Sequence, residues 1–172
     1  MGIIEIVMHK ILLTKGLYAV VDGSDADLIN SLGWNWQASK SHYTDTHYAA
    51  SYRPRANGEF RAIYMHRLIL GVTDPDIDVD HRDGNGLNNC RSNLRLCNAS
   101  QNAANMAKPR GALSQYKGVH RCAGKWRAQI THLGKRHHLG YFVGESDAAR
   151  AYDAAARALF GEFARTNFQD AC

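Results

Sequence analysis

Short runs of hydrophobic residues, separated by polar turns, fill the first third of the chain. β-Branched and aromatic residues gather in five such runs, at residues 11–13, 17–21, 34–37, 48–52 and 60–64. Runs of this kind predict strands, and Asn57 with Gly58 predicts a hairpin turn between the last two. Residues 25–32 and 65–70 are expected to form short helices ending at glycine. Residues 1–64 are therefore predicted to be a β-rich region.

The last third of the chain has a different pattern, with three strands followed by one helix. The strands are predicted at residues 116–122, 125–131 and 135–142, with glycine-containing turns between them. Residues 145–160 repeat small and apolar side chains at helical spacing, which predicts one buried helix face. We expect a three-stranded antiparallel sheet with one packed helix, and an α+β, modular fold for the whole chain.

Polar residues dominate the segment between these regions. Asp80 and His81 precede a turn-forming loop, Asn93 lies twelve residues after His81, and Asn102 lies twenty-one residues after it. If residues 98–105 are helical, Asn98, Asn102 and Asn105 share one face. Asparagine is a poor helix former, so three on one face indicate a use for the side chains. The alternative is a polar surface helix capped by Asn98.

A calcium-binding loop is the first chemistry that this segment suggests. Asp76, Asp78 and Asp80 have the spacing of loop positions 1, 3 and 5. An EF-hand loop also needs glycine at position 6 and glutamate at position 12. His81 and Leu87 stand there instead, which excludes this type of calcium site.

A nuclease motif accounts for the same residues better. The run VDHRDGNGLNNCRSNLRLCNASQNAAN, residues 79–105, resembles the HNH (ββα-metal) motif in the variant whose last histidine is asparagine. It is most similar to phage-type HNH homing endonucleases. The resemblance implies that His81 and Asn93 are the catalytic residues, His81 as general base and Asn93 as the amide that holds the hairpin and His81. It also implies that Asp80 and Asn102 bind one divalent cation, Mg²⁺ or another.

The implied roles agree with the chemistry of these side chains. A histidine with a pKa of about 6.5 can accept a proton from water at neutral pH, and Mg²⁺ is held by few protein oxygens. Consecutive residues of an ideal strand point to opposite faces, so Asp80 and His81 share a site only if the strand ends or bulges there. For His66, which is typical of the family, a structural or phosphate-contact role is expected. For Arg91 and Arg95, phosphate contact and surface exposure both remain open.

The charge of the chain is unevenly distributed. The net charge of +5 combines −1 over residues 1–107 with +6 over residues 108–172, and residues 108–139 contain eight Lys and Arg but no acid. Such a block predicts a polyanionic partner. No apolar run is long enough to span a membrane, so we expect double-stranded DNA as partner and no membrane.

The basic block belongs to a second recognisable pattern. Residues 116–168 resemble the AP2/ERF DNA-binding domain, through YKGV at 116–119, LGYF at 139–142 and AARAYD at 148–153. The resemblance implies that the sheet enters the major groove. Strand alternation agrees with this, because Trp126, Ala128 and Ile130 are expected to face the helix and leave the other face of the sheet free. The predicted DNA-binding residues are Lys117, His120, Arg121, Lys125, Arg127, Gln129, Thr131, Arg136 and His138, together with Asn105. His120, Thr131 and His138 depart from the plant pattern, so the plant target sequence is not transferred.

The chain contains four cysteines. None has the C-x-x-C spacing of a redox or zinc motif, which indicates free thiols in the cytoplasm. We expect a monomer with no small-molecule cofactor, divided into a β-rich region (1–64), an HNH core (65–107), a linker (108–115) and an AP2-like domain (116–172). The predicted function is metal-dependent, site-specific DNA cleavage of the homing-endonuclease type. The alternative is a non-catalytic, AP2-type transcription factor.

Overall fold

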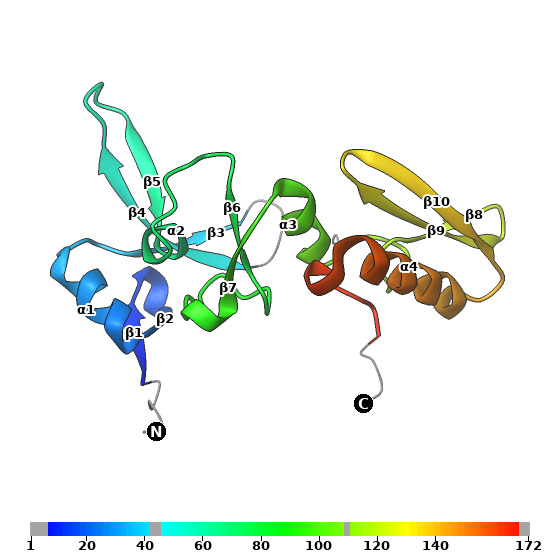
Figure 1. Ribbon diagram of the computed structural model, residues 1–172, viewed down its shortest axis with the longest axis horizontal. Helices are drawn as coiled ribbons and strands as arrows, with labels where there is room; N and C mark the ends of the chain where they lie inside the picture. The colour runs from blue at the N-terminus through cyan, green and yellow to red at the C-terminus, as the bar shows by residue number, and fades with distance from the viewer. Residues whose placement is uncertain (1–6, 42–45, 109–110, 169–172) are drawn as a thin grey trace. The chain divides into compact units, whose positions relative to one another are not determined.

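The computed structural model describes residues 7–41, 46–108 and 111–168 (Figure 1). Two compact units make up the chain, Met1–Leu96 and Cys97–Cys172, and each has its own core. The fold is α+β with several small antiparallel sheets, as the sequence predicted. Residues 109 and 110 of the predicted linker lie outside the described residues.

The first unit begins with a hairpin, a helix and a three-stranded sheet. The elements are β1 (Met8–Leu12), the 3-10 turn η1 (Thr14–Gly16), β2 (Tyr18–Asp22), α1 (Gly23–Ser31), β3 (Gln37–Lys40), β4 (His47–Pro54), β5 (Phe60–Tyr64) and α2 (Met65–Ile69). β1 pairs with β2, and the second sheet has the order β3-β4-β5. The strand predicted at residues 34–37 was wrong in position: it begins only at Gln37, where pairing with β4 begins, and Trp36 packs in the core before it.

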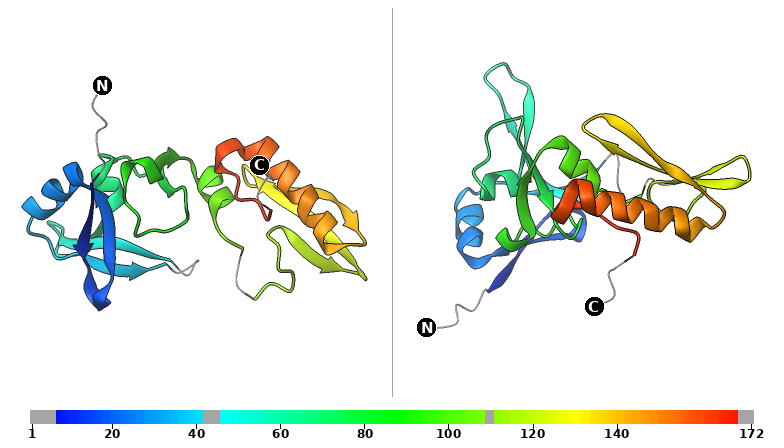
Figure 2. Two further views of the ribbon diagram at one scale, coloured as in Figure 1. Left: turned by 90° about the horizontal axis from the view of Figure 1, so that it is seen from below. Right: turned by 45° about the vertical axis from the view of Figure 1, so that its right-hand side comes forward.

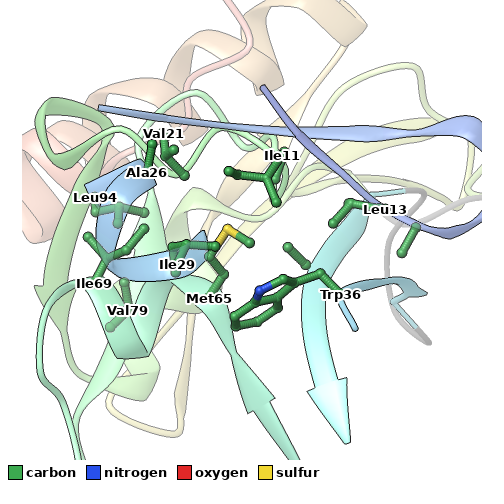
Figure 3. Packing of buried hydrophobic residues seen from close by; sticks show 13 residues of the cluster. Ile11, Leu13, Val21, Ala26, Ile29, Trp36, Met65, Ile69, Val79 and Leu94 are labelled. Atoms are coloured by element: carbon green, nitrogen blue, oxygen red, sulfur yellow. The ribbon is translucent and has the colours of Figure 1, made fainter. Parts of the chain in front are cut away.

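A β-hairpin follows these elements. It consists of β6 (Asp78–His81), the turn η2 (Arg91–Asn93) and β7 (Leu94–Cys97). The core below it joins side chains from β1, β2, α1, α2 and this hairpin (Figure 3). Ile29 and Met65 are almost completely buried there, and Val79 and Leu94 bring both strands of the hairpin onto the same core.

One glycine brings the loop of this hairpin against the sheet. A Cβ on Gly86 would lie 2.5 Å from both the Tyr48 ring and the His47 carbonyl oxygen, so only glycine fits. The Gly86 backbone N–H also donates to the Thr46 hydroxyl at 3.0 Å. The sheet of the β-rich region and the loop of the HNH motif are therefore packed together.

The second unit has the predicted sheet and packed helix. Its elements are α3 (Ala99–Asn105), β8 (Val119–Cys122), β9 (Lys125–His132), β10 (Lys135–Phe142), α4 (Glu145–Phe160) and η3 (Gly161–Phe163). The strand order is β10-β9-β8, and α4 runs along one face of this sheet (Figure 2). Ala128 and Ile130 of β9 are buried, as the alternation predicted. Gly118 lacks a side chain because the Tyr152 ring fills that space.

Candidate active site and nucleic-acid interface

The loop after β6 is held in shape by Asn93. Its side-chain amide donates to the Asp83 carboxylate at 3.0 Å and to the Asn88 carbonyl at 2.8 Å, while its own oxygen accepts from the Asp83 N–H at 3.1 Å. The Asn93 carbonyl also accepts the Arg82 N–H at 2.9 Å. These bonds fix both ends of the loop that follows His81, which is the role that the resemblance implied for this amide.

Asp80 and His81 are both buried, at 6% and 4% exposure. β6 ends at His81, so the alternation of an ideal strand does not continue past these two residues. Asp80 is bound by Arg95, whose Nε and Nη2 lie 2.8 and 2.7 Å from the same carboxylate oxygen, Oδ2. Arg95 is itself buried, so surface exposure, one of the two roles that the sequence left open, is wrong. Its guanidinium is paired with Asp80 in this structure.

The imidazole of His81 lies among aromatic rings and one buried amide. Its ring centre is 5.7 Å from that of Tyr48 and 5.0 Å from that of His66. Its Nε2 is 3.5 Å from Oδ1 of Asn89, which is fully buried. Burial lowers the pKa of His81, and the Asn89 hydrogen bond and the nearby Asp83 and Asp80 charges oppose this shift. The imidazole is therefore mainly neutral at pH 7.

His66 forms the floor of this cluster. Its ring stacks on Tyr64, with centres 5.5 Å apart, and its Nδ1 is buried with no hydrogen-bond partner among the described residues. Burial lowers the pKa of His66 to about 3, with further contributions from His81 and Arg67. The side chain stays neutral throughout the range in which a nuclease works, which favours a structural role.

Sequence reasoning missed two residues of this site, Tyr48 and Asn89, and the pairing of a third, Arg95, with Asp80. Tyr48 lies 33 positions before His81, and no spacing in the chain connects them. Burial, and after it the Asp80 charge, raises the pKa of Tyr48, so its phenol is protonated beside the carboxylate. Arg95 was noticed as a candidate, but its pairing with Asp80 depends on the register of β6 and β7.

The donor chemistry fits a hard divalent cation. The described residues contain no group of three or more His, Cys, Asp or Glu that could form a complete metal cage. Mg²⁺ is commonly bound by one or two carboxylates, with water and substrate phosphate completing its shell. Asp80 supplies a carboxylate and Asn102 an amide oxygen, both of the preferred type. Asn102 is carried by α3 in the second unit, and its pairing with Asp80 stays a prediction.

Helix α3 has a capping box at its N-terminus. Asn98 accepts the Gln101 N–H at 2.9 Å, and Gln101 in return accepts the Asn98 N–H at 2.9 Å. Asn98 is thus the cap that the sequence allowed. Asn105, predicted to contact DNA, is only 8% exposed, so little of its surface is available to a partner.

The predicted DNA-binding residues of the sheet fall into two groups. Cross-strand pairing joins His120 to Arg127, His138 to Gln129, and Arg136 to Thr131. Paired residues share a face, so these six lie together on the face opposite α4. The Gln129 amide lies 3.0 Å from His120 Nε2. Lys125 lies two residues before Arg127 on β9, so its side chain is on the same face of the sheet.

Two predicted residues lie elsewhere in this unit. Arg121 pairs with Trp126 and stacks over its indole ring at 4.9 Å, on the side of the sheet that faces the helix. The Lys117 ammonium donates to carbonyls at the end of α3, those of Ala104 and, at 2.7 Å, Met106. Burial, and after it the Arg165 charge, lowers the pKa of Lys117 to about 8. Its contact with α3 is direct and favours a structural role over the DNA contact that the sequence predicted, which the structure does not test.

Comparison with known proteins agrees with the site. The family model described as HNH endonuclease matches residues 64–104, which include β6, the loop and β7. An uncharacterised HNH endonuclease of Acanthamoeba polyphaga mimivirus is 34% identical over 168 residues, covering 96% of this chain and 83% of that protein. The chain belongs to the HNH endonuclease family.

Other relatives of this HNH endonuclease match parts of it. Protein 3.8 of Escherichia phage T7 is 36% identical over 117 residues, which is 67% of this chain and 96% of that protein. Dehydration-responsive element-binding protein 2A of Oryza sativa is 46% identical over 65 residues, 36% of this chain and 24% of that protein. The enzyme thus combines a nuclease motif with a segment like plant DNA-binding proteins. No helix in its described part is long and apolar enough to cross a membrane.

Proposed function

We propose that this HNH endonuclease is a metal-dependent, site-specific enzyme of the homing type that hydrolyses phosphodiester bonds in duplex DNA. The observation that carries the proposal is the pair Asp80 and His81 at the end of β6, both buried and followed by a loop that Asn93 holds. A carboxylate and a neutral imidazole side by side are the groups that hydrolysis of a phosphodiester requires. The viral relatives and the similarity to plant DNA-binding proteins support a site-specific enzyme.

His81 acts as the general base. Its lowered pKa keeps the imidazole unprotonated at neutral pH, so one ring nitrogen can accept a proton from the attacking water. Asn89 and the rings of Tyr48 and His66 restrict how the imidazole can turn. The base is thereby held in one orientation before DNA arrives.

Asp80 and Asn102 would hold the divalent cation. When bound, the cation supplies Lewis-acid stabilisation of the phosphoryl oxygen and of the leaving 3′ oxygen. Arg95 fixes the Asp80 carboxylate through Oδ2 and offsets part of its charge. One carboxylate ligand leaves the cation positively charged, which suits a phosphate substrate.

The second unit directs the enzyme to its site. The six residues that share the sheet face include Arg127 and Arg136. Burial, and after it the charges of these two arginines, lowers the pKa of His120 on the same face. This face is electropositive and suits phosphates and guanine edges. We propose a monomer acting in the cytoplasm. A non-catalytic transcription factor would not need the buried pair of Asp80 and His81.

Asp80→Asn tests the proposal. This variant keeps the size of the side chain and an acceptor for Arg95, whereas alanine would leave the arginine buried without its partner. We expect cleavage of DNA flanking the enzyme's own gene to fall below detection with Mg²⁺ present, while DNA affinity is unchanged. Asp76→Asn, at an exposed acid four residues earlier, is the matched control. Normal cleavage by Asp80→Asn would contradict the assignment.

A further inference from the structure

The outer half of the β4–β5 hairpin stands free of the sheet. β3 pairs with β4 only from His47 to Ala50, whereas β4 and β5 stay paired out to Pro54 and Phe60. Beyond Ala50, the described strands form a ribbon of two. Figure 1 shows this ribbon projecting from the first unit. A two-stranded ribbon is narrow enough to enter the major groove of DNA.

One face of the ribbon carries a line of aromatic rings that starts at the candidate base. Tyr48, whose ring lies 5.7 Å from that of His81, belongs to this face with Tyr64. Register places Tyr52 and Phe60 on the same face, because Tyr52 pairs with Ala62 and Pro54 with Phe60. The exposed fraction rises outward, to 42% at Tyr52 and 69% at Phe60. An apolar face thus extends from the active site into solvent.

The opposite face of the ribbon is basic. Arg53 and Arg61 lie directly across from each other, an arrangement of like charges that is unfavourable in isolation. Arg53 stacks on Trp34 at 4.9 Å, and Arg55 follows at the exposed tip. Glu59, the one acid in residues 51–63, accepts a hydrogen bond from Asn57. The three arginines therefore exceed the acids, and a polyanion would relieve their repulsion.

We propose that this ribbon, residues 51–63, is a second DNA-binding element that enters the groove beside the cleaved bond. Its occupant is duplex DNA, because the aromatic face is continuous with His81 and the other face is arginine-rich. Phe60 and Tyr52 pack against bases, and the arginines contact phosphates. Phe60 lies four residues beyond Tyr64, or about 13 Å along the strand. Since base pairs rise about 3.4 Å, Phe60 contacts DNA roughly four base pairs from the cut.

Footprinting of the full-length enzyme tests this inference, which rests on the proposed function for the position of the cut. Hydroxyl-radical footprints and affinities are measured for wild type, Phe60→Ala and Arg61→Gln on one DNA, in chelator. Leu12→Ala is the matched control, since Leu12 is 64% exposed on a strand of the same unit. We expect Phe60→Ala to weaken binding by roughly 5- to 150-fold, the range for the loss of one base pair's contacts in a specific duplex site. The protected patch near the cut should disappear, and Leu12→Ala should change neither.

Three other outcomes are informative. A footprint and affinity for Phe60→Ala equal to those of Leu12→Ala would overturn the inference. So would a wild-type dimer that Phe60→Ala converts to a monomer with an unchanged footprint, because the aromatic face would then be a contact between two copies. If wild type binds DNA but never cuts it, the proposed function fails, and a patch lost in both Phe60→Ala and Arg61→Gln would still support the ribbon.

Discussion

The rings of two buried histidines, His66 and His81, pack edge to face in the site, with their centres 5.0 Å apart. Burial lowers the pKa of both, and a proton on either one would repel a proton on the other. Both are therefore neutral at pH 7. They differ in surroundings, since His81 has a polar neighbour in Asn89 and His66 packs between tyrosines. This difference suits His81 as the base and His66 as its support.

His81→Ala should lower the single-turnover cleavage rate by about 10²–10⁴-fold, the usual contribution of a positioned general base. DNA affinity should change little. In the wild type, the rate should rise with pH through a midpoint below pH 6.5, because the base is active unprotonated and its pKa is lowered. The variant should lose this acidic limb. A near-normal rate for His81→Ala would move the base to another residue.

His66 should affect stability against acid. Its pKa falls from 6.5 to about 3 on folding, so the unfolded chain binds the proton more tightly than the folded chain. The free energy of unfolding should therefore decrease as pH falls from 6.5 towards 3, by about 1.4 kcal/mol per pH unit from this one group. In His66→Phe that contribution disappears, so urea unfolding between pH 6 and pH 4.5 should show a shallower decline. Parallel curves for wild type and variant would contradict this, and His9→Phe, at an exposed position, is the control.

Among the elements, α3 links the nuclease motif to the AP2-like unit. Its residue Ala104 belongs to the apolar cluster of Ile130, Tyr152, Ala156 and Phe160, and the Ser100 hydroxyl accepts the Leu133 N–H at 3.2 Å. Lys117 caps its last carbonyls. The helix that carries Asn102 is therefore built into the core of the DNA-binding unit.

Lys117→Met should reveal whether this lysine supports α3 or contacts DNA. We expect the variant to unfold with a free energy lower by about 1.5–3 kcal/mol, through loss of the charged hydrogen bonds to α3. The salt dependence of DNA binding should stay as in the wild type. Lys125→Met is the control: it should leave stability unchanged and reduce the slope of log affinity against log salt by about 0.9. The reverse pattern would assign Lys117 to the DNA interface.

Local patterns predicted these elements well, and the contacts between them poorly. Alternation on β9 predicted that Ala128 and Ile130 are buried, since strand periodicity depends only on neighbouring residues. The resemblance implied the role of Asn93, and its hydrogen-bond partners, Asp83 and Asn88, lie within ten residues of it. Tyr48 could not, because it reaches His81 only through packing of the sheet against the Gly86 loop. Trp36 shows the same limit, because it packs in a core whose other residues come from distant parts of the chain.

For the whole molecule, the division into two units places most of the proposed cleavage residues in the first unit and the predicted DNA-binding sheet in the second. The first unit contains Asp80, His81 and Asn93, and the second contains the basic sheet face. A fragment that starts at residue 116 would lose α3, and the apolar side chains that pack against Ala104 would become exposed. A fragment of residues 97–172 keeps that core intact and is the better test of the DNA-binding unit.

This fragment should bind duplex DNA without cutting it. The logarithm of its affinity should fall linearly with the logarithm of salt concentration, by about 0.9 for each phosphate contacted. Arg127→Ala and Arg136→Ala should weaken binding, because both lie on the exposed sheet face. Arg150→Ala, on α4 and stacked on Phe168, should matter less. Loss of binding with Arg150→Ala alone would place the DNA on the helix instead of the sheet.

Metal-dependent cleavage is the most direct measurement of the central claim. The full-length enzyme is incubated with DNA flanking its own gene, first with Mg²⁺, then with excess chelator, and finally with Mg²⁺ restored, while binding is followed in parallel. We expect site-specific cutting with Mg²⁺, none in chelator despite retained binding, and recovery when Mg²⁺ returns, because the proposed mechanism requires a cation at Asp80 and Asn102. Undiminished cutting in excess chelator would contradict the claim.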